Sequence, residues 1–316
     1  MKKMKKWILV VLCLSLFALM AIGSGSSDAN EDKEIVTTEA EDSGDAAAAD
    51  SEGADSSLVS ESESVDTAQS VTIEEQILVD QDGIMITAKS YTIDPIWGDG
   101  IEVLIENNSD KNVTIGCNAL IINNYMITDL FISDIAAGKK ANETIYLSST
   151  GLKAAGIESV GQIEIYFRAY DSASYEDIFS TDVVTIQTSE FANMDTTADD
   201  SGTELYNADG IRIVGKKVDE NSFWGTAILL YIENNSGTNI GVQCNNMSIN
   251  GFMMTPYFSS DVYAGKKAID DITILSDELE SNGIESVDEV ELQFHIYNYD
   301  TYETIVDTDP IIFSAQ

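Results

Sequence analysis

An internal repeat with a fixed offset of 127 residues constrains this chain more than any other feature. Trp97 recurs as Trp224, and the segments around the two tryptophans match without a gap. The matched segments are Asp82-Gly83 with Asp209-Gly210, Ile105-Glu106-Asn107-Asn108-Ser109 with Ile232-Glu233-Asn234-Asn235-Ser236, Cys117-Asn118 with Cys244-Asn245, Ala137-Gly138-Lys139-Lys140-Ala141 with Ala264-Gly265-Lys266-Lys267-Ala268, and Gly156-Ile157-Glu158-Ser159-Val160 with Gly283-Ile284-Glu285-Ser286-Val287. A gapless duplication predicts two similar domains, at residues 73–189 and 204–316, with a linker at 190–203.

Each copy shows the two-residue apolar period of half-buried β-strands. Residues that share an apolar face are Ile101, Val103, Ile105, Ile163, Ile165, Phe167 and Ala169 in the first copy, and Ile228, Leu230, Ile232, Val290, Leu292, Phe294 and Ile296 in the second. The Asp-Gly pairs predict turns that enter a strand, and one short helix in each copy ends at Gly156 or Gly283, with Ser276 as the N-cap of the second. The fold class that this predicts is all-β, with two tandem immunoglobulin-like antiparallel β-sandwiches.

The repeated motifs also carry a family resemblance. They are Ile-Glu-Asn-Asn-Ser, then Cys-Asn, then an asparagine at Asn123 or Asn250, then Ser-Asp before Ala-Gly-Lys-Lys-Ala, then Gly-Ile-Glu-Ser-Val. In these motifs the chain resembles uncharacterised secreted proteins and lipoproteins of Gram-positive bacteria that carry one or two immunoglobulin-like domains. The resemblance implies an exported protein built from sandwiches, and it implies no activity.

The N-terminal residues have the composition of an export signal. Four lysines within residues 1–6 precede an apolar run that ends at Ile22, which predicts a signal peptide over residues 1–23 with cleavage before Ser24. A lipoprotein would need a cysteine at that place, so we expect secretion, with anchoring to the outer face of the cytoplasmic membrane as the alternative. Residues 24–72 are acidic and small, which predicts a disordered linker.

Charge and residue counts exclude several classes of function. The formal net charge of -39 argues against nucleic acid and against anionic membranes, apart from an uncleaved N-terminal signal. Cys117 and Cys244 are equivalent and single in each copy, so we expect buried thiols and no disulfide. His295 has Arg168 as its counterpart, which excludes a catalytic base shared by both copies. Without a hydrolase, zinc or phosphate-loop motif, we expect no catalytic residue, no resident metal and no cofactor, although distant carboxylates could join Asp134 or Asp261 in a calcium site.

The candidate ligand-binding residues are therefore aromatic and basic side chains. They are Trp97, Trp224, Lys139, Lys140, Lys266, Lys267, Tyr175 and Tyr302. A tryptophan in a loop can stack on a sugar or a peptide, or it can fold back over the end of the sandwich. The lysines could bind a carboxylate or phosphate of a partner or could be solvated turn residues, and the tyrosines could form a surface or pair across strands. We expect a non-catalytic extracellular binding protein for an unknown surface ligand, a protein or a glycan. The alternatives are a passive envelope or stalk protein and, third, a hydrolase with a carboxylate-based site.

Overall fold

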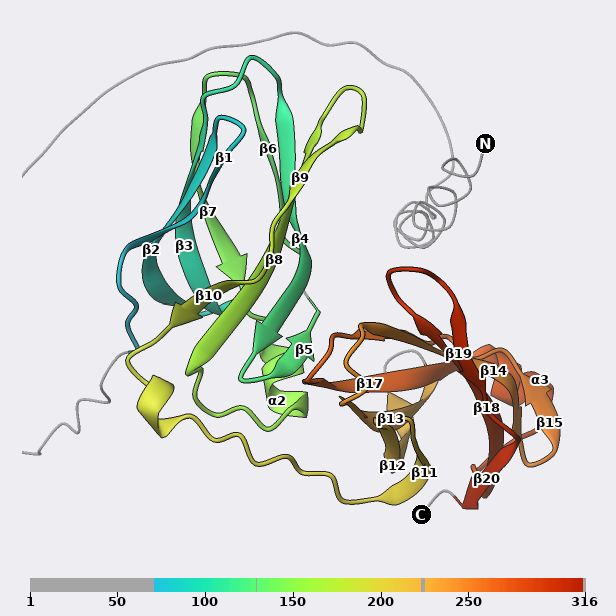
Figure 1. Cartoon of the computed structure of the whole chain (residues 1–316). Coiled ribbons are helices and arrows are strands. Elements are labelled where there is room, and N and C mark those ends of the chain that lie inside the picture. The colour runs from blue at the N-terminus through green and yellow to red at the C-terminus, as the bar shows by residue number, and fades with distance from the viewer. Residues whose placement is uncertain (1–70, 129, 223–224, 315–316) are drawn as a thin grey trace, which may run out of the picture. The chain divides into compact units, whose positions relative to one another are not determined.

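Figure 1 shows a computed structural model of the chain, which describes residues 71–128, 130–222 and 225–314. The predicted signal peptide and nearly all of the predicted acidic linker lie outside these residues. Within the described ranges, no helix has the length and apolar character needed to cross a membrane.

The first repeat forms two antiparallel sheets. Its elements are β1 (Gln76–Gln81), β2 (Ile84–Asp94), β3 (Gly98–Asn107), β4 (Val113–Ile122), β5 (Tyr125–Ile127), β6 (Ile132–Ile135), β7 (Lys140–Tyr146), α2 (Ser149–Ala154), β8 (Gln162–Asp171), β9 (Asp177–Ser180) and β10 (Val184–Gln187). One sheet has the order β1-β2-β3-β7. The other contains β10-β8-β4-β5, with β6 paired to β4 and β9 paired to β8. The helix α2 lies between β7 and β8 in the chain.

The second repeat reproduces this pattern after the short 3-10 helix η1 (Phe191–Asn193). Its elements are β11 (Thr203–Ala208), β12 (Ile211–Ser222), β13 (Gly225–Asn234), β14 (Ile240–Ile249), β15 (Phe252–Met254), β16 (Ser259–Val262), β17 (Lys266–Leu275), α3 (Ser276–Ser281), β18 (Glu289–Asn298), β19 (Thr304–Asp307) and β20 (Ile311–Ser314). Most elements start 127 residues after their counterparts. The predicted fold class, tandem immunoglobulin-like sandwiches with one short α-helix each, is confirmed. The domain boundaries stay a prediction.

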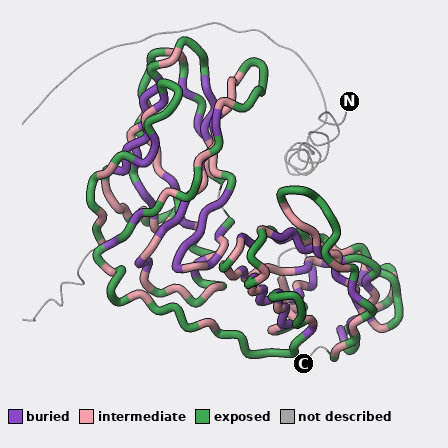
Figure 2. The backbone as a smooth tube through the Cα atoms, viewed as in Figure 1, coloured by how far each residue is buried: buried purple, intermediate pink, exposed green. Residues whose placement is uncertain are grey.

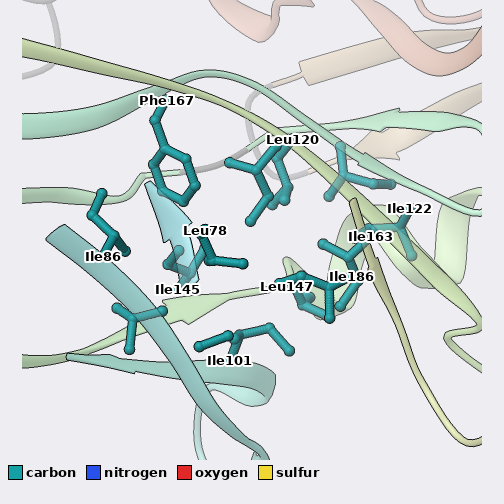
Figure 3. Packing of buried hydrophobic residues seen from close by; sticks show 14 of the residues in the cluster. Leu78, Ile86, Ile101, Leu120, Ile122, Ile145, Leu147, Ile163, Phe167 and Ile186 are labelled. Carbon is teal, nitrogen blue, oxygen red and sulfur yellow. The ribbon is translucent and has the colours of Figure 1, made fainter. Parts of the chain in front are cut away.

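The apolar faces predicted from alternation form the interiors. Ile163, Ile165 and Phe167 on β8 are all fully buried. Their counterparts on β18 are at most 1% exposed. In Figure 3 the side chains of Phe167, Leu78 and Ile86 point toward the same space from different strands. Figure 2 shows buried residues along the strands and exposed residues along the loops. Burial of every second side chain is thus the main stabilising term of each sandwich.

The hairpin turns follow the predicted chemistry. Asp82 and Gly83, between β1 and β2, have φ values of 52° and 79°. Asp209 and Gly210 repeat them with 53° and 77°. Two successive residues with positive φ make the tight turn whose twist matches that of antiparallel strands. The prediction of a turn entering a strand is confirmed in both copies.

The helix stops are confirmed, whereas the predicted N-cap is wrong. Gly156 and Gly283 have φ values of 68° and 69°, as expected for glycines that end helices. In α3 the N-cap is Leu275, without a side-chain cap bond, and Ser276 is already the first helical residue. The reason is that β17 runs directly into the helix. In the first repeat, Ser148 occupies the N-cap position and accepts a bond from the N–H of Gly151.

The repeated Asn-Asn-Ser motif places a buried side-chain amide at the end of β3 and β13. Asn234 is fully buried, and its Nδ2 donates to the carbonyls of Thr238 and Val262, both at 2.8 Å. Its Oδ1 accepts from the N–H and the hydroxyl of Ser236. Asn107 makes the equivalent four bonds in the first repeat. The motif therefore joins a strand end, a turn and the neighbouring sheet.

We expect Asn234→Ala to lower the free energy of unfolding by at least about 2 kcal/mol, because it leaves buried carbonyl groups without donors. The neighbouring Asn235→Ala is the matched control, since Asn235 is exposed, and we expect a change of less than about 0.5 kcal/mol. Urea unfolding of both variants measures the difference. Equal losses would contradict the role assigned to the buried amide.

Candidate functional site

The end of β2 and the turn that joins it to β3 expose large apolar side chains. Ile93, Ile96 and Trp97 are 64%, 83% and 63% exposed. The ring of Tyr146, at the end of β7, lies 6.1 Å from the Trp97 ring, centroid to centroid. We call these four residues the tryptophan tip. Trp97 lies on a turn with most of its side chain exposed, and its role in binding stays a prediction.

A carboxylate fixes the shape of this tip. Oδ1 of Asp94 accepts hydrogen bonds from the N–H of Ile96 at 2.7 Å and of Trp97 at 2.8 Å. The bonds from Trp97 and Ile96 lower the pKa of Asp94 below its ordinary value. The tip is thus a defined turn that presents its side chains to solvent. Trp224, the counterpart of Trp97, lies outside the described residues.

Two further hairpins, β8–β9 and β18–β19, carry exposed tyrosines at matched positions. Tyr175 and Tyr302 are each 55% exposed and have φ values of 59° and 61°. Each ring stacks on a tyrosine of the preceding strand, at 6.2 Å on Tyr170 and at 5.9 Å on Tyr297. We call these the tyrosine hairpins, and their loops are visible in Figure 1. A bulky residue with positive φ is uncommon, and here it occurs twice at one repeat position.

Each stack continues to a third, basic residue. The Arg168 guanidinium lies 5.2 Å from the centre of the Tyr170 ring and pairs with Asp177 at 2.7 Å. In the second repeat the His295 ring stacks on Tyr297 at 5.5 Å. His295 Nδ1 is 2.6 Å from Asp307 Oδ1. The two hairpins thus share a design in which a basic group and two tyrosines lie in a row.

The four predicted lysines fall into different environments. Lys139 is exposed, and Lys140 forms an ion pair with Glu106 of the same repeat. Lys266, the counterpart of Lys139, is largely enclosed and binds Glu164 and the side chain of Asn124. This ion pair lies beside the place where β17 of the second repeat pairs with β5 of the first. The two strands run parallel there.

Lys267 also interacts within the chain. Its Nζ donates to the carbonyl of Thr196 at 3.3 Å and lies 5.6 Å from the centre of the Tyr125 ring. The sequence left open a partner's carboxylate or a solvated turn. The structure shows the second lysine pair bound to the chain itself.

The cysteines and the histidine have ordinary surroundings. Cys244 is buried, and burial raises its pKa to about 12, so the thiol is held neutral. Cys117 is partly buried. His295 is partly exposed on the outer face of β18, as alternation predicts.

Two carboxylates from neighbouring strands meet in the second repeat. Burial raises the pKa of Asp270, on β17, to about 6. Burial, and then the charge of Asp270, raise the pKa of Asp261, on β16, to about 6. In the described part of the chain no three histidine, cysteine or acidic residues are grouped as a metal site would require.

The described cavities lie elsewhere. One of about 350 Å³ lies between β12 and β20, lined among others by Gly215, Val218 and Phe313. Another of about 530 Å³ lies in the first repeat where β1 meets β10. None of the seven candidate residues that the structure describes lines either of them. The exposed aromatic groups lie on hairpins outside these cavities, which suits contact with a surface rather than enclosure of a small molecule.

Sequence reasoning missed Ile93, Ile96 and the stacking role of Arg168. The two isoleucines stand within four residues of Trp97, so an apolar count around the tryptophan would have found them. Arg168 and His295 were compared only as possible bases. Their position two residues before a repeated tyrosine was the available signal.

Comparison with known proteins does not assign the chain to a family. No protein-family model and no curated sequence matches it. Among solved structures, the Salmonella enterica SafA pilin in complex with the SafB chaperone aligns with a TM-score of 0.18 and 9% identity, over 68% of this chain and 88% of that one. A protein of unknown function from Porphyromonas gingivalis gives 0.20 and 8%, over 78% and 98%.

A Bacteroides uniformis beta-glucuronidase gives a TM-score of 0.21 and 12% identity, over 74% of this chain and 26% of the glucuronidase. TM-scores this low carry no argument about function. The site must be interpreted from its own geometry.

We expect Asp270→Asn to stabilise the protein at pH 7 and to have little effect near pH 4. Because the folded-state pKa of about 6 exceeds the unfolded value of 3.8, the carboxyl contributes its full stability below about pH 4 and loses it as the pH rises through 6. Urea unfolding of the variant and the wild type at pH 4, 5, 6 and 7 measures the effect.

Asp94→Asn serves as a control of opposite sign. The pKa of Asp94 is lowered, so its contribution is present above pH 3.8 and lost as the pH falls. This variant should be destabilised at pH 7, with the difference shrinking in acid. A pH-independent effect of Asp270→Asn would show that the carboxyl does not carry the burial penalty described.

Proposed function

We propose that this chain is a non-catalytic binding protein of the cell exterior, which presents its tryptophan tip to a surface ligand, a protein or a glycan. The observation that carries the proposal is the exposure of Ile93, at the end of β2, and of Ile96 and Trp97, on the turn that follows it. Exposure of large apolar side chains to water is unfavourable. A ligand that covers them therefore gains free energy from their burial.

The local geometry of the turn supports ligand binding. The two hydrogen bonds to Asp94 fix the backbone that carries Ile96 and Trp97, so little conformational entropy is lost when a ligand is bound. The flat indole face and the adjacent Tyr146 ring suit stacking on a sugar ring or packing on an apolar protein surface. Tryptophan and tyrosine are also the residues that most often dominate binding energy at interfaces.

The N-terminal segment and the charge support a place of action outside the cell. A lysine-rich start with a short apolar run suits export, either with release or with retention at the membrane. The acidic residues 24–72 would then separate the sandwiches from the envelope. The net charge of -39 keeps the protein away from polyanionic polymers, so the ligand is neutral or cationic.

We expect Trp97→Ala to weaken binding of the full chain at least about tenfold on an array of glycans and surface proteins, because an anchoring aromatic residue at an interface is worth more than about 1.4 kcal/mol. Ile96→Ala should weaken it less. Phe252→Ala, which removes an exposed aromatic ring from β15, is the control and should bind as the wild type does.

Equal signals from the wild type and Trp97→Ala would remove the tryptophan tip as the binding surface. If the wild type bound nothing on such arrays, the alternative of a passive envelope or stalk protein would replace the proposal.

A further inference from the structure

The tyrosine hairpin of the second repeat places an exposed aromatic ring among carboxylates. Tyr302 is 55% exposed, and Asp300 and Glu303 beside it are exposed. Residues 295–307 contain three acidic residues and no lysine or arginine. An aromatic face with negative charge around it is the combination that attracts an organic cation, because both the ring quadrupole and the carboxylates favour positive charge.

The first repeat shows how such a hairpin holds a cation. There the Arg168 guanidinium lies over the Tyr170 ring and bonds Asp177 with Nε at 2.9 Å and Nη2 at 2.7 Å. A guanidinium is therefore held between a tyrosine face and a carboxylate on this same scaffold. The second repeat has His295 at the matching position, so its hairpin supplies no permanent cation of its own.

We propose that the Tyr302 hairpin binds arginine or lysine side chains of a basic segment in a partner protein. The exposed part of the Tyr302 ring receives the cation, and Asp300 and Glu303 pair with it or with its neighbours in the partner. The charge of -39 concentrates basic partners near the surface. This site shares no residue with the tryptophan tip, so the proposal is independent of the proposed function and can be tested separately.

The two repeats should differ in strength. In the first hairpin, Arg168 already neutralises Asp177, and Lys111 lies 3.3 Å from Asp171. At the matching positions, the second repeat has His295 in place of Arg168 and Thr238 in place of Lys111. Tyr175 therefore forms the weaker of two related cation sites, and Tyr302 the stronger.

The test titrates the full chain with an oligoarginine peptide. We expect Tyr302→Leu to weaken binding about two- to fivefold, because leucine keeps the charge of the protein and removes the ring. Tyr302→Phe should bind as the wild type does. Tyr257→Leu removes a tyrosine of similar exposure from another surface, leaves the charge unchanged and should have no effect. Tyr175→Leu should weaken binding less than Tyr302→Leu.

A second measurement does not depend on a variant. Proton resonances of the Tyr302 ring in the wild-type protein should shift during the peptide titration, whereas those of Tyr257 should not. Thermal unfolding confirms that each variant is folded.

The proposal is overturned if Tyr302→Leu binds oligoarginine as tightly as the wild type, since diffuse attraction by the acidic surface would then explain all binding. It is also overturned if a neutral oligosaccharide binds in a Tyr302-dependent manner and oligoarginine does not. Absence of any ring shift in the wild type would have the same meaning.

Discussion

The structure depends on the two-residue period with which isoleucine, leucine, valine and phenylalanine recur along its strands. Ile86, Ile101 and Phe167 come from three different strands, and all are fully buried in one interior. Because successive side chains of a strand point to opposite faces, this period fixes which face of each sheet packs inward. The duplicated pattern specifies a second interior in the same way. Loops, turns and exposed aromatic groups take the positions that this packing leaves to them.

The exposed aromatic side chains lie outside the packed interiors, so local interactions hold them in place. Asp94 does this for the tryptophan tip with two backbone hydrogen bonds. In the tyrosine hairpins, a left-handed backbone at Tyr175 and Tyr302 costs about 1 to 2 kcal/mol each. Stacking on Tyr170 and Tyr297 offsets part of that cost. In the second repeat the Tyr297 ring lies against the backbone of Gly241, where any side chain would collide with it.

Duplication gave two copies of one scaffold, and substitution then gave them different surfaces. Lys139 is exposed, whereas its counterpart Lys266 is enclosed in an ion pair with Glu164. Arg168 has become His295, so one hairpin carries a permanent cation and the other does not. The shared fold therefore does not imply a shared ligand for the two repeats.

Much of the architecture could be predicted because its causes are local. Alternation gave the strands, the Asp-Gly pairs gave the turns at Asp82 and Asp209, and the glycines at 156 and 283 gave the helix ends. The prediction of Ser276 as the N-cap was wrong because a strand that continues into a helix has no separate capping residue. The sequence alone does not show where β17 ends. Lys266 could not be placed because its partner Glu164 is distant in the chain.

The sequence by itself determined a duplicated all-β chain with acidic charge, its turn positions and its candidate aromatic residues, since each follows from periods and motifs of a few residues. Tertiary structure alone decided which of those candidates face solvent. Trp97 came to lie beside Tyr146, and Tyr302 came to stack on Tyr297 and, through it, on His295. The physical reason is that exposure and pairing depend on contacts between strands, which close only when the sheets have formed.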